Sequence, residues 1–422
     1  MKIRALRANS AGGRARVAAD VIWEDCDRPS QEVYFECPAS FAEDIAPNPN
    51  AFLLACAMPA MDYGERRVQV EGSVCPELRN GLLAAFRVIS DWYSQCKGSV
   101  IEPTLGFHPS MPRTPPRVAS FMSGGIDALA TLRCNRLDFP LDHPASIRDC
   151  FFFLGFNRND LEANGPVPER VQDFQRRLGR MSELARDAQI NFIPVHTNVR
   201  FIAKDHQAWN ERGMGAGLAS IAHAFSRRIT RVLIGSSGSS GIPSPWGSHP
   251  LLDPNFSSSD LEVRHDGLQL SRLQKTAIVS DWAAAMSILQ CCWQNEGIPE
   301  TINCGRCGKC LRTMIHLAAL DKLDKTLAFP HVQITPEMID AMGFVDESDV
   351  GFLEECIEHF EKMGRRDLVQ AIRDRIKRYE DWIHGRGWRN VIRRWDKKLT
   401  HEFVTRSARR VLGRLRKLQG KV

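Results

Sequence analysis

The sequence predicts an α/β fold with a parallel sheet and helices on both faces. Two observations carry this prediction. Short apolar segments alternate with helical segments from residue 118 to residue 235, and such alternation is typical of parallel sheets. The first apolar segment, residues 118–122, leads into Ser123-Gly124-Gly125 and then into a helix that begins near Asp127.

The glycine turn is a candidate phosphate site. Gly124 and Gly125 leave backbone N–H groups without side chains around them, and Ile126 and Asp127 open the following helix. A helix N-terminus with bare amides binds anions, most often phosphate, because its N–H groups and its dipole both favour negative charge. The alternative is an ordinary strand-to-helix turn that needs glycine only for its backbone angles.

Further along this region the elements follow in order. Each is predicted from the spacing of its apolar residues. Strands are expected at residues 150–156, 190–198 and 231–235, and helices at residues 171–188 and 216–228. The carboxyl ends of such strands place ligands along one edge of the sheet.

The chain divides into three predicted regions. Residues 1–112 are expected to form an α+β domain, residues 113–329 an α/β domain that contains the glycine turn, and residues 330–422 a helical, basic C-terminal region. Five prolines between residues 103 and 116 predict the first linker. In the N-terminal region, the spacing of apolar residues predicts strands at 15–23, 32–37 and 68–72, and helices at 51–58 and 78–92.

Composition sets outer bounds on the class of protein. The 422 residues are 43% hydrophobic and 25% charged, which is ordinary for a globular chain. No apolar run approaches the roughly 20 residues of a membrane span, and the N-terminus lacks the apolar segment of a secretory signal. We therefore expect a cytoplasmic protein, in which thirteen cysteines indicate free thiols and a metal site rather than disulfides.

The run Ser123-Gly124-Gly125-Ile126-Asp127 resembles the S-G-G-x-D-S loop of the PP-loop ATP pyrophosphatase superfamily. The resemblance implies cleavage of ATP between its α- and β-phosphates, with the loop around the departing pyrophosphate. It implies ATP and Mg²⁺ as cofactors, with Asp127 the ligand of Mg²⁺. This chain has Ala128 where the family has Ser or Thr, so one hydroxyl is missing from the phosphate site.

The same resemblance implies further site residues. In similar enzymes a lysine near the start of a later helix reaches the triphosphate, and Lys275 is the best candidate, with Arg272 second. A cation there would offset charge that builds on the leaving pyrophosphate. The alternative is a solvated basic helix end. The end of the second strand, at Phe156, would line the adenine pocket.

A serine- and glycine-rich segment follows the strand at residues 231–235. Gly235, Ser236 and Ser237 lie where a substrate loop is expected, at the carboxyl end of a core strand. A mobile lid or flexible linker is the alternative. Downstream, His249 and Asp253 could form an acid–base pair or a metal ligand and its neighbour, or Asp253 could simply cap a turn.

A cysteine cluster predicts a metal site. Cys304, Cys307 and Cys310 are spaced by two residues, with glycines that allow a tight knuckle. Cys292 is the expected fourth ligand of a zinc ion, although Cys291 stands beside it. An iron–sulfur cluster, catalytic thiols and unligated thiols remain as alternatives.

The order of these motifs extends the resemblance. A PP-loop, a lysine helix and C-x11-C-x2-C-x2-C together resemble the 7-cyano-7-deazaguanine synthase family, over about residues 118–320. Those enzymes adenylate a carboxylate, add ammonia and dehydrate the amide to a nitrile, and they carry a structural zinc. The N-terminal domain and the C-terminal tail lie outside the resembling part.

The C-terminal tail is strongly basic. From Arg386 onward it holds thirteen Lys or Arg residues against two Asp or Glu residues. The helix expected at residues 406–418 could bind nucleic acid, an acidic partner protein or an anionic membrane surface, or could be a solvated helix that packs one apolar stripe on its own domain. Trp382, Trp388 and Trp395 could stack on bases or belong to a core.

These observations predict an ATP-dependent ligase that forms a carbon–nitrogen bond. A small-molecule or protein carboxylate would be activated by adenylation, with Asp127 and Lys275 as catalytic residues, and then attacked by ammonia or an amine. One alternative is a nucleic-acid-modifying enzyme with deazaguanine or thiolation chemistry. Another is a catalytically silent nucleotide-binding scaffold.

Overall fold

The computed structural model describes residues 1–156, 160–162, 165–238, 245–292, 301–342 and 348–383. The chain forms two compact units. The first comprises Met1–Cys304 with Asp324–Pro330, and the second comprises Gly305–Leu323 with His331–Val422. The first unit is built on a sheet, and the described part of the second is helical.

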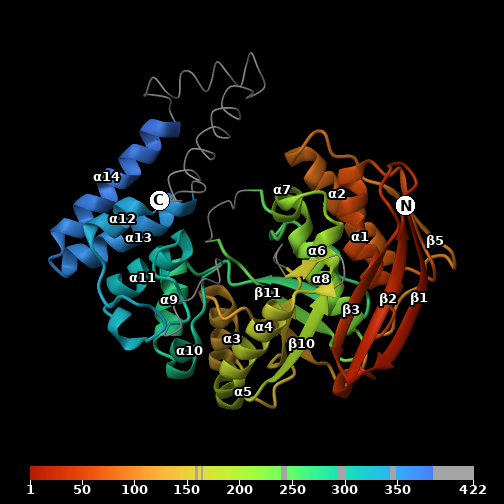
Figure 1. The fold of residues 1–422 in the computed structure, drawn as a ribbon, viewed down its shortest axis with the longest axis horizontal. Helices are drawn as coiled ribbons and strands as arrows, with labels where there is room; N and C mark the ends of the chain where they lie inside the picture. Colours follow the sequence, from red (N-terminus) through yellow and green to blue (C-terminus); the bar gives the residue numbers. More distant parts are fainter. Residues whose placement is uncertain (157–159, 163–164, 239–244, 293–300, 343–347, 384–422) are drawn as a thin grey trace. The chain divides into compact units, whose positions relative to one another are not determined.

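Ten strands form one sheet in the order β12-β11-β6-β7-β10-β3-β2-β1-β4-β5. The five strands from β12 to β10 are mutually parallel (Figure 1). This mostly parallel sheet confirms the α/β class. The strands of this sheet are β1 (Lys2–Ala11), β2 (Arg14–Ile22), β3 (Gln31–Pro38), β4 (Arg67–Val70), β5 (Val100–Pro103), β6 (Val118–Phe121), β7 (Ile147–Leu154), β10 (Asn191–Thr197), β11 (Arg231–Gly235) and β12 (Glu262–Asp266).

Helices pack on this sheet in two groups (Figure 1). One group comprises α1 (Pro49–Tyr63), α2 (Pro76–Trp92) and α8 (Met214–Ala224), in which α1 contacts α8 directly. The other comprises α3 (Ile126–Asp138), α4 (Pro168–Arg180), α5 (Ser182–Ala188), α9 (Arg272–Ser280) and α10 (Ala283–Ile288). Because helices cover both faces, the central strand β6 is buried at all four positions.

Shorter elements complete the first unit. They are the paired β8 (Leu161–Glu162) and β9 (Gly165–Pro166), the helices α6 (Val199–Ile202) and α7 (His206–Ala208), a π-helical turn at Trp209–Gly213, and 3₁₀ turns at Ala39–Phe41 and Asp253–Phe256. The expected helix at residues 171–188 is divided at Met181, between α4 and α5.

The N-terminal strands do not form a unit of their own. β3 pairs with β10 in antiparallel register, Glu36 opposite His196 and Phe35 opposite Thr197. The Thr197 hydroxyl also donates to the carbonyl of Tyr34 at 2.7 Å. The compact unit therefore crosses the boundary expected at residue 112. The physical reason is that β10 would otherwise be an open sheet edge, which β3 closes.

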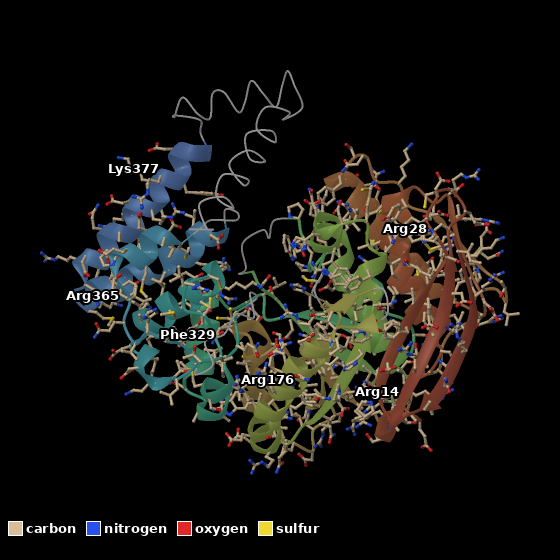
Figure 2. All side chains as sticks on the ribbon, in the orientation of Figure 1. Arg14, Arg28, Arg176, Phe329, Arg365 and Lys377 are labelled. Carbon is tan, nitrogen blue, oxygen red and sulfur yellow. The ribbon has the colours of Figure 1, made fainter. Side chains whose placement is uncertain are left out.

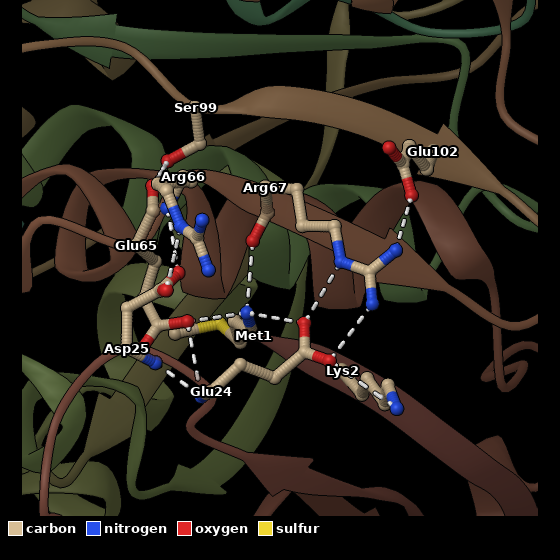
Figure 3. Close-up of polar contacts among 9 residues, drawn as sticks. All are labelled: Met1, Lys2, Glu24, Asp25, Glu65, Arg66, Arg67, Ser99 and Glu102. Carbon is tan, nitrogen blue, oxygen red and sulfur yellow. Dashed lines mark hydrogen bonds and ion pairs between the residues drawn. The ribbon is translucent and has the colours of Figure 1, made fainter.

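A buried ion-pair network ties together the start of β1, the loop after β2 and the loop before β4 (Figure 3). The Met1 ammonium pairs with the fully buried carboxylate of Glu65 and donates to the carbonyl of Arg67 at 2.9 Å. Glu65 also accepts the backbone N–H groups of Glu24 and Asp25 at 3.0–3.2 Å. Arg67 clasps the Glu24 carboxylate, and this guanidinium lowers the pKa of Glu24 to about 2.

The described part of the second unit is a helical group: α11 (Gly308–Ala319), α12 (Pro336–Ala341), α13 (Ser348–Lys362) and α14 (Arg366–Ile383). Its helices are amphipathic. Leu368 and Ile372 are buried, whereas Arg365 and Lys377 lie on the surface (Figure 2). The basic tail, with the helix expected at residues 406–418 and with Trp388 and Trp395, lies outside the described residues. No helix in the described part of the chain has the length and apolar character that a membrane crossing requires.

Candidate functional site

The strand order reverses between β6 and β11. β7 and then β10 lie on one side of β6, while β11 and then β12 lie on the other. In open parallel sheets such a reversal point is where ligands bind, at the carboxyl ends of the two central strands. The loops that follow these two strands are the glycine turn at Ser123 and the segment that begins at Gly235.

The backbone conformation of the glycine turn suits an anion-binding site made of main-chain N–H groups. Gly124 has a φ of +79°, a conformation that favours glycine. Gly125 stands at the N-cap of α3 and donates its N–H to the Ser123 hydroxyl at 3.3 Å. Ser123 is exposed, whereas the side chain of Ile126 is fully buried. Ile126 can therefore offer only its backbone to a ligand.

Gly235, the last residue of β11, lies closely against the start of α3. A Cβ atom at this position would lie 3.0 Å from both the Asp127 carbonyl oxygen and the Thr131 hydroxyl. Only glycine fits this approach without a shift of its neighbours. The following residue, Ser236, is 2% exposed and donates its N–H to the carbonyl of Asp266 at 2.7 Å. The expected substrate loop thus begins beside the glycine turn, although residues 239–244 lie outside the described part of the chain.

Two basic residues of α9 reach this junction. Ser271 and Gln274 form a capping box that fixes the start of the helix. Arg272, the first residue of α9, binds both carboxylate oxygens of Asp127 at 2.8 Å. Lys275 is 2% exposed, and its ammonium donates to the carbonyls of Ser236 at 2.6 Å and Gly238 at 3.3 Å.

Burial lowers the pKa of Lys275, and the nearby carboxylate of Asp127 partly opposes this shift. Burial likewise raises the pKa of Asp266, at the end of β12, against a hydrogen bond from Thr131. The solvated helix end considered as an alternative for Lys275 is inconsistent with this burial. The structure therefore brings together the sequence-predicted Asp127, Arg272 and Lys275 with both loops.

His249 and Asp253 are close in sequence but their side chains have different partners. Asp253 is fully buried, and its carboxylate accepts hydrogen bonds from the Ser248 hydroxyl and from Nδ1 of His265, both at 2.7 Å. The His249 ring accepts the N–H of Leu251 and packs edge-on against Trp92. The expected acid–base pair is thus replaced by an Asp253–His265 pair. Sequence reasoning missed His265 because it overlooked the polar edge strand β12.

Phe156 follows β7, where an adenine-lining residue is expected. Its ring contacts Trp209 edge-on at 4.9 Å and Phe153 at 4.2 Å between centroids. Its carbonyl accepts a hydrogen bond from Arg200, which lies after β10. Neither Arg200 nor Trp209 belongs to a motif by which the sequence could predict a role for it. They come to this edge of the sheet through the order of the strands.

The four predicted cysteines form one group. Cys292, Cys304, Cys307 and Cys310 are buried, and their sulfur atoms all lie within 4.8 Å of one another. Zinc–sulfur bonds of about 2.3 Å in a tetrahedron require sulfur atoms about 3.8 Å apart, so these thiols can converge on one ion with small adjustments. Cys307 and Cys310 are 3.4 Å apart. The choice of Cys292 over Cys291 agrees with this geometry.

Asn303 holds the chain beside this group and was not singled out from the sequence. Its side chain is fully buried. The side-chain oxygen Oδ1 accepts hydrogen bonds from the N–H groups of Cys291 at 2.8 Å and Cys292 at 3.0 Å. The side-chain nitrogen Nδ2 donates to the carbonyls of Leu289 and Ala328. The only available signal was its place directly before Cys304.

Searches with protein-family models, against curated proteins and against solved structures each found no match to the chain. Fold and site alone therefore define its class. It is a doubly wound α/β protein with a ten-stranded sheet and a buried four-cysteine group that could hold a metal ion.

Proposed function

We propose that the protein is an ATP-dependent ligase that adenylates a carboxylate, like the 7-cyano-7-deazaguanine synthases that its motifs resemble. One observation carries the proposal. A glycine turn at a helix N-terminus, an acidic residue and two basic residues meet where the strand order reverses. Anionic ligands bind at such turns, and the basic residues match the charge of a triphosphate.

The residues would divide the work as follows. Backbone N–H groups at Gly124 to Ile126 would hold phosphate oxygens, and the Ser123 hydroxyl would add one donor. Asp127 would hold Mg²⁺, which neutralises phosphate charge when bound. Lys275 and Arg272 would stabilise the leaving pyrophosphate. Before ATP binds, both of these basic side chains have partners within the protein, which they would exchange for phosphate oxygens.

The reaction would balance in two steps. A carboxylate oxygen attacks the α-phosphorus, the bond to the β-phosphate oxygen breaks, and pyrophosphate leaves with that electron pair. Ammonia or an amine then attacks the acyl carbon and loses a proton, and AMP departs. The carboxylate would belong to a small molecule or to a protein.

We further propose zinc as the ion of the cysteine group. Four thiolates favour zinc in a closed tetrahedral site, where it contributes folding free energy and has no open position for substrate. Iron with acid-labile sulfide in the purified protein would instead identify a cluster and reopen thiol chemistry.

Product analysis tests the function. The protein would be incubated with α-labelled ATP, Mg²⁺, ammonium and a panel of carboxylates, and the nucleotides separated by chromatography. AMP and pyrophosphate are expected, and ADP as the sole product would exclude the proposal. A second candidate, a silent nucleotide-binding scaffold, is favoured by Ala128 and by the engaged carboxylate of Asp127. It would bind ATP and yield no AMP with any carboxylate.

A further inference from the structure

The glycine turn is contacted by the segment that leads to the cysteine group. The N–H of Gln290 donates to the carbonyl of Gly124 at 2.8 Å. A Cβ atom placed on Gly124 would lie 3.2 Å from the Cβ of Gln290 and 3.1 Å from the methyl group of Met181. Gln290 therefore contacts the turn at Gly124, the residue with positive φ.

The same segment is fixed at its other end by Asn303. The Asn303 amide spans from the carbonyl of Leu289 to the N–H groups of Cys291 and Cys292. Gln290 lies between these anchored residues. Asn303 itself directly precedes Cys304, and Cys292 and Cys304 both belong to the cysteine group. A short hydrogen-bonded path thus joins the sulfur ligands to the Gly124 carbonyl.

We propose that metal binding at the cysteine group and nucleotide binding at the glycine turn are energetically coupled through residues 289–292 and Asn303. The inference rests on the proposed function for its nucleotide and goes beyond it in making the metal a regulator of that site. The metal would fix the positions of Cys292 and Cys304. Because Asn303 precedes Cys304 and hydrogen-bonds to Cys292, its side chain would be held in place too. The Gln290 N–H would then keep its hydrogen bond to the Gly124 carbonyl.

The direction of the coupling follows from the cost of ordering. A turn that is already held in its binding conformation loses less conformational freedom when phosphate arrives. Without metal, four thiols need not converge, so the segment between Leu289 and Cys292 has fewer constraints. Metal should therefore raise nucleotide affinity, and nucleotide should raise metal affinity by the same factor.

The first experiment measures both affinities by calorimetry. Full-length protein, loaded with zinc or stripped of metal, would be titrated with ATP and Mg²⁺. We expect ATP to bind to the zinc-loaded protein at least about tenfold more tightly than to the stripped protein, within the usual range of coupling. Equal affinity in the two forms would overturn the coupling. No ATP binding by the zinc-loaded protein would instead overturn the proposed function.

A matched pair of variants isolates the bridge. Gln290→Pro removes the N–H that reaches Gly124, whereas Gln290→Ala keeps it and removes only the side chain. In zinc-loaded protein, the proline variant should bind ATP as weakly as the stripped wild type, and the alanine variant should bind as the wild type does. Equal ATP affinities of the two variants would refute the path through Gln290.

Amide hydrogen exchange tests the path without any nucleotide. On removal of zinc, the amide of Gln290 and those of residues 123–126 should exchange faster, while strand β2 stays protected and reports a folded sheet. Gln290→Pro, but not Gln290→Ala, should speed exchange of residues 123–126 in zinc-loaded protein. Unchanged exchange of this turn in the proline variant would overturn the inference, even if stripping unfolds the chain or ATP fails to bind.

Discussion

Arg272 binds both carboxylate oxygens of Asp127 at 2.8 Å, and this ion pair joins the first turn of α9 to the first turn of α3. Asp127 thus has a cationic partner in the absence of any ligand. Mg²⁺ and the phosphates of ATP would compete with this pair, Mg²⁺ for the carboxylate and phosphate for the guanidinium. Binding of the two ligands should therefore be mutually dependent.

Asp127→Asn tests this carboxylate. The amide keeps the shape of the side chain but removes the negative charge, so we expect AMP formation to fall by about 100-fold or more, as for loss of one key electrostatic group in an active site. Asp138→Asn, an exposed position at the other end of α3, should leave the rate unchanged. AMP release in single-turnover assays decides between them, and retained activity in Asp127→Asn would remove it from the site.

Lys275 should make stability depend on pH. Burial lowers its pKa below the ordinary value of 10.5, so between the two values the unfolded chain binds more protons than the folded protein. Stability should then rise with pH across that window, and the gain is lost again as pH falls through the window to the folded pKa. Urea unfolding of wild type and Lys275→Met at several alkaline pH values would give a more positive slope of stability against pH for the wild type than for the variant, because the other alkaline groups are common to both. Parallel slopes would contradict the shift.

The cysteine group should hold one metal ion per chain. Cys307→Ser removes one ligand and should lower the free energy of unfolding by at least ~3 kcal/mol, since structural zinc contributes folding free energy of this order or more. Cys291→Ser is the matched control, because Cys291 stands beside Cys292 but outside the group. Elemental analysis and thermal unfolding of both variants would check this. Loss of metal from the Cys291 variant would mean that the fourth ligand is misassigned.

Elements with apolar, two-sided burial were predictable from the sequence, and edge or half-exposed strands were not. The strand expected at residues 231–235 coincides with β11, which is central. β12 and β1 were overlooked because their exposed faces carry Arg, Glu, His or Asn, so no apolar run marks them. An edge or half-exposed strand needs few apolar residues, and its partners are distant in sequence.

The candidate site shows the same division. Spacing alone predicted Cys292, Cys304, Cys307 and Cys310, because ligands of one ion lie close in sequence. Asn303, Gln290 and His265 were not predicted, because their importance comes from contacts such as Gln290 to Gly124 that only the folded chain creates. The pairing of Asp253 with His265 rather than His249 has the same origin.

Glu65 should be more important for stability than any exposed carboxylate near it. Glu65→Gln removes the fully buried carboxylate of this network and leaves the Met1 ammonium with the partly exposed carboxylate of Glu24 at 3.1 Å. We expect a cost of about 3 kcal/mol, the lower end of the range for loss of one member of a buried pair. Glu102→Gln removes a half-exposed partner of Arg67 and should cost less than ~1 kcal/mol. Chemical denaturation of the two variants would compare them directly. Equal losses would place the stabilisation elsewhere in the network.

The basic tail offers a test of partners. Truncation after residue 385 removes thirteen Lys or Arg residues and should weaken binding to a polyanion such as RNA and flatten its dependence on salt. ATP turnover on a small carboxylate should persist. Binding of RNA by the truncated protein with the full salt slope would assign that contact to another surface, and loss of folding would make the tail part of the core.

The pairing of β3 with β10 also limits how this protein can be dissected. A fragment that starts at residue 113 would keep every proposed ligand of ATP and metal, yet it would present the bare backbone of β10 to any other chain. Two such fragments could pair edge to edge through this strand. The N-terminal strands thus cover the edge of the parallel part of the sheet. A transplant of residues 113–330 into another protein would need to include these strands or supply a substitute strand for β10.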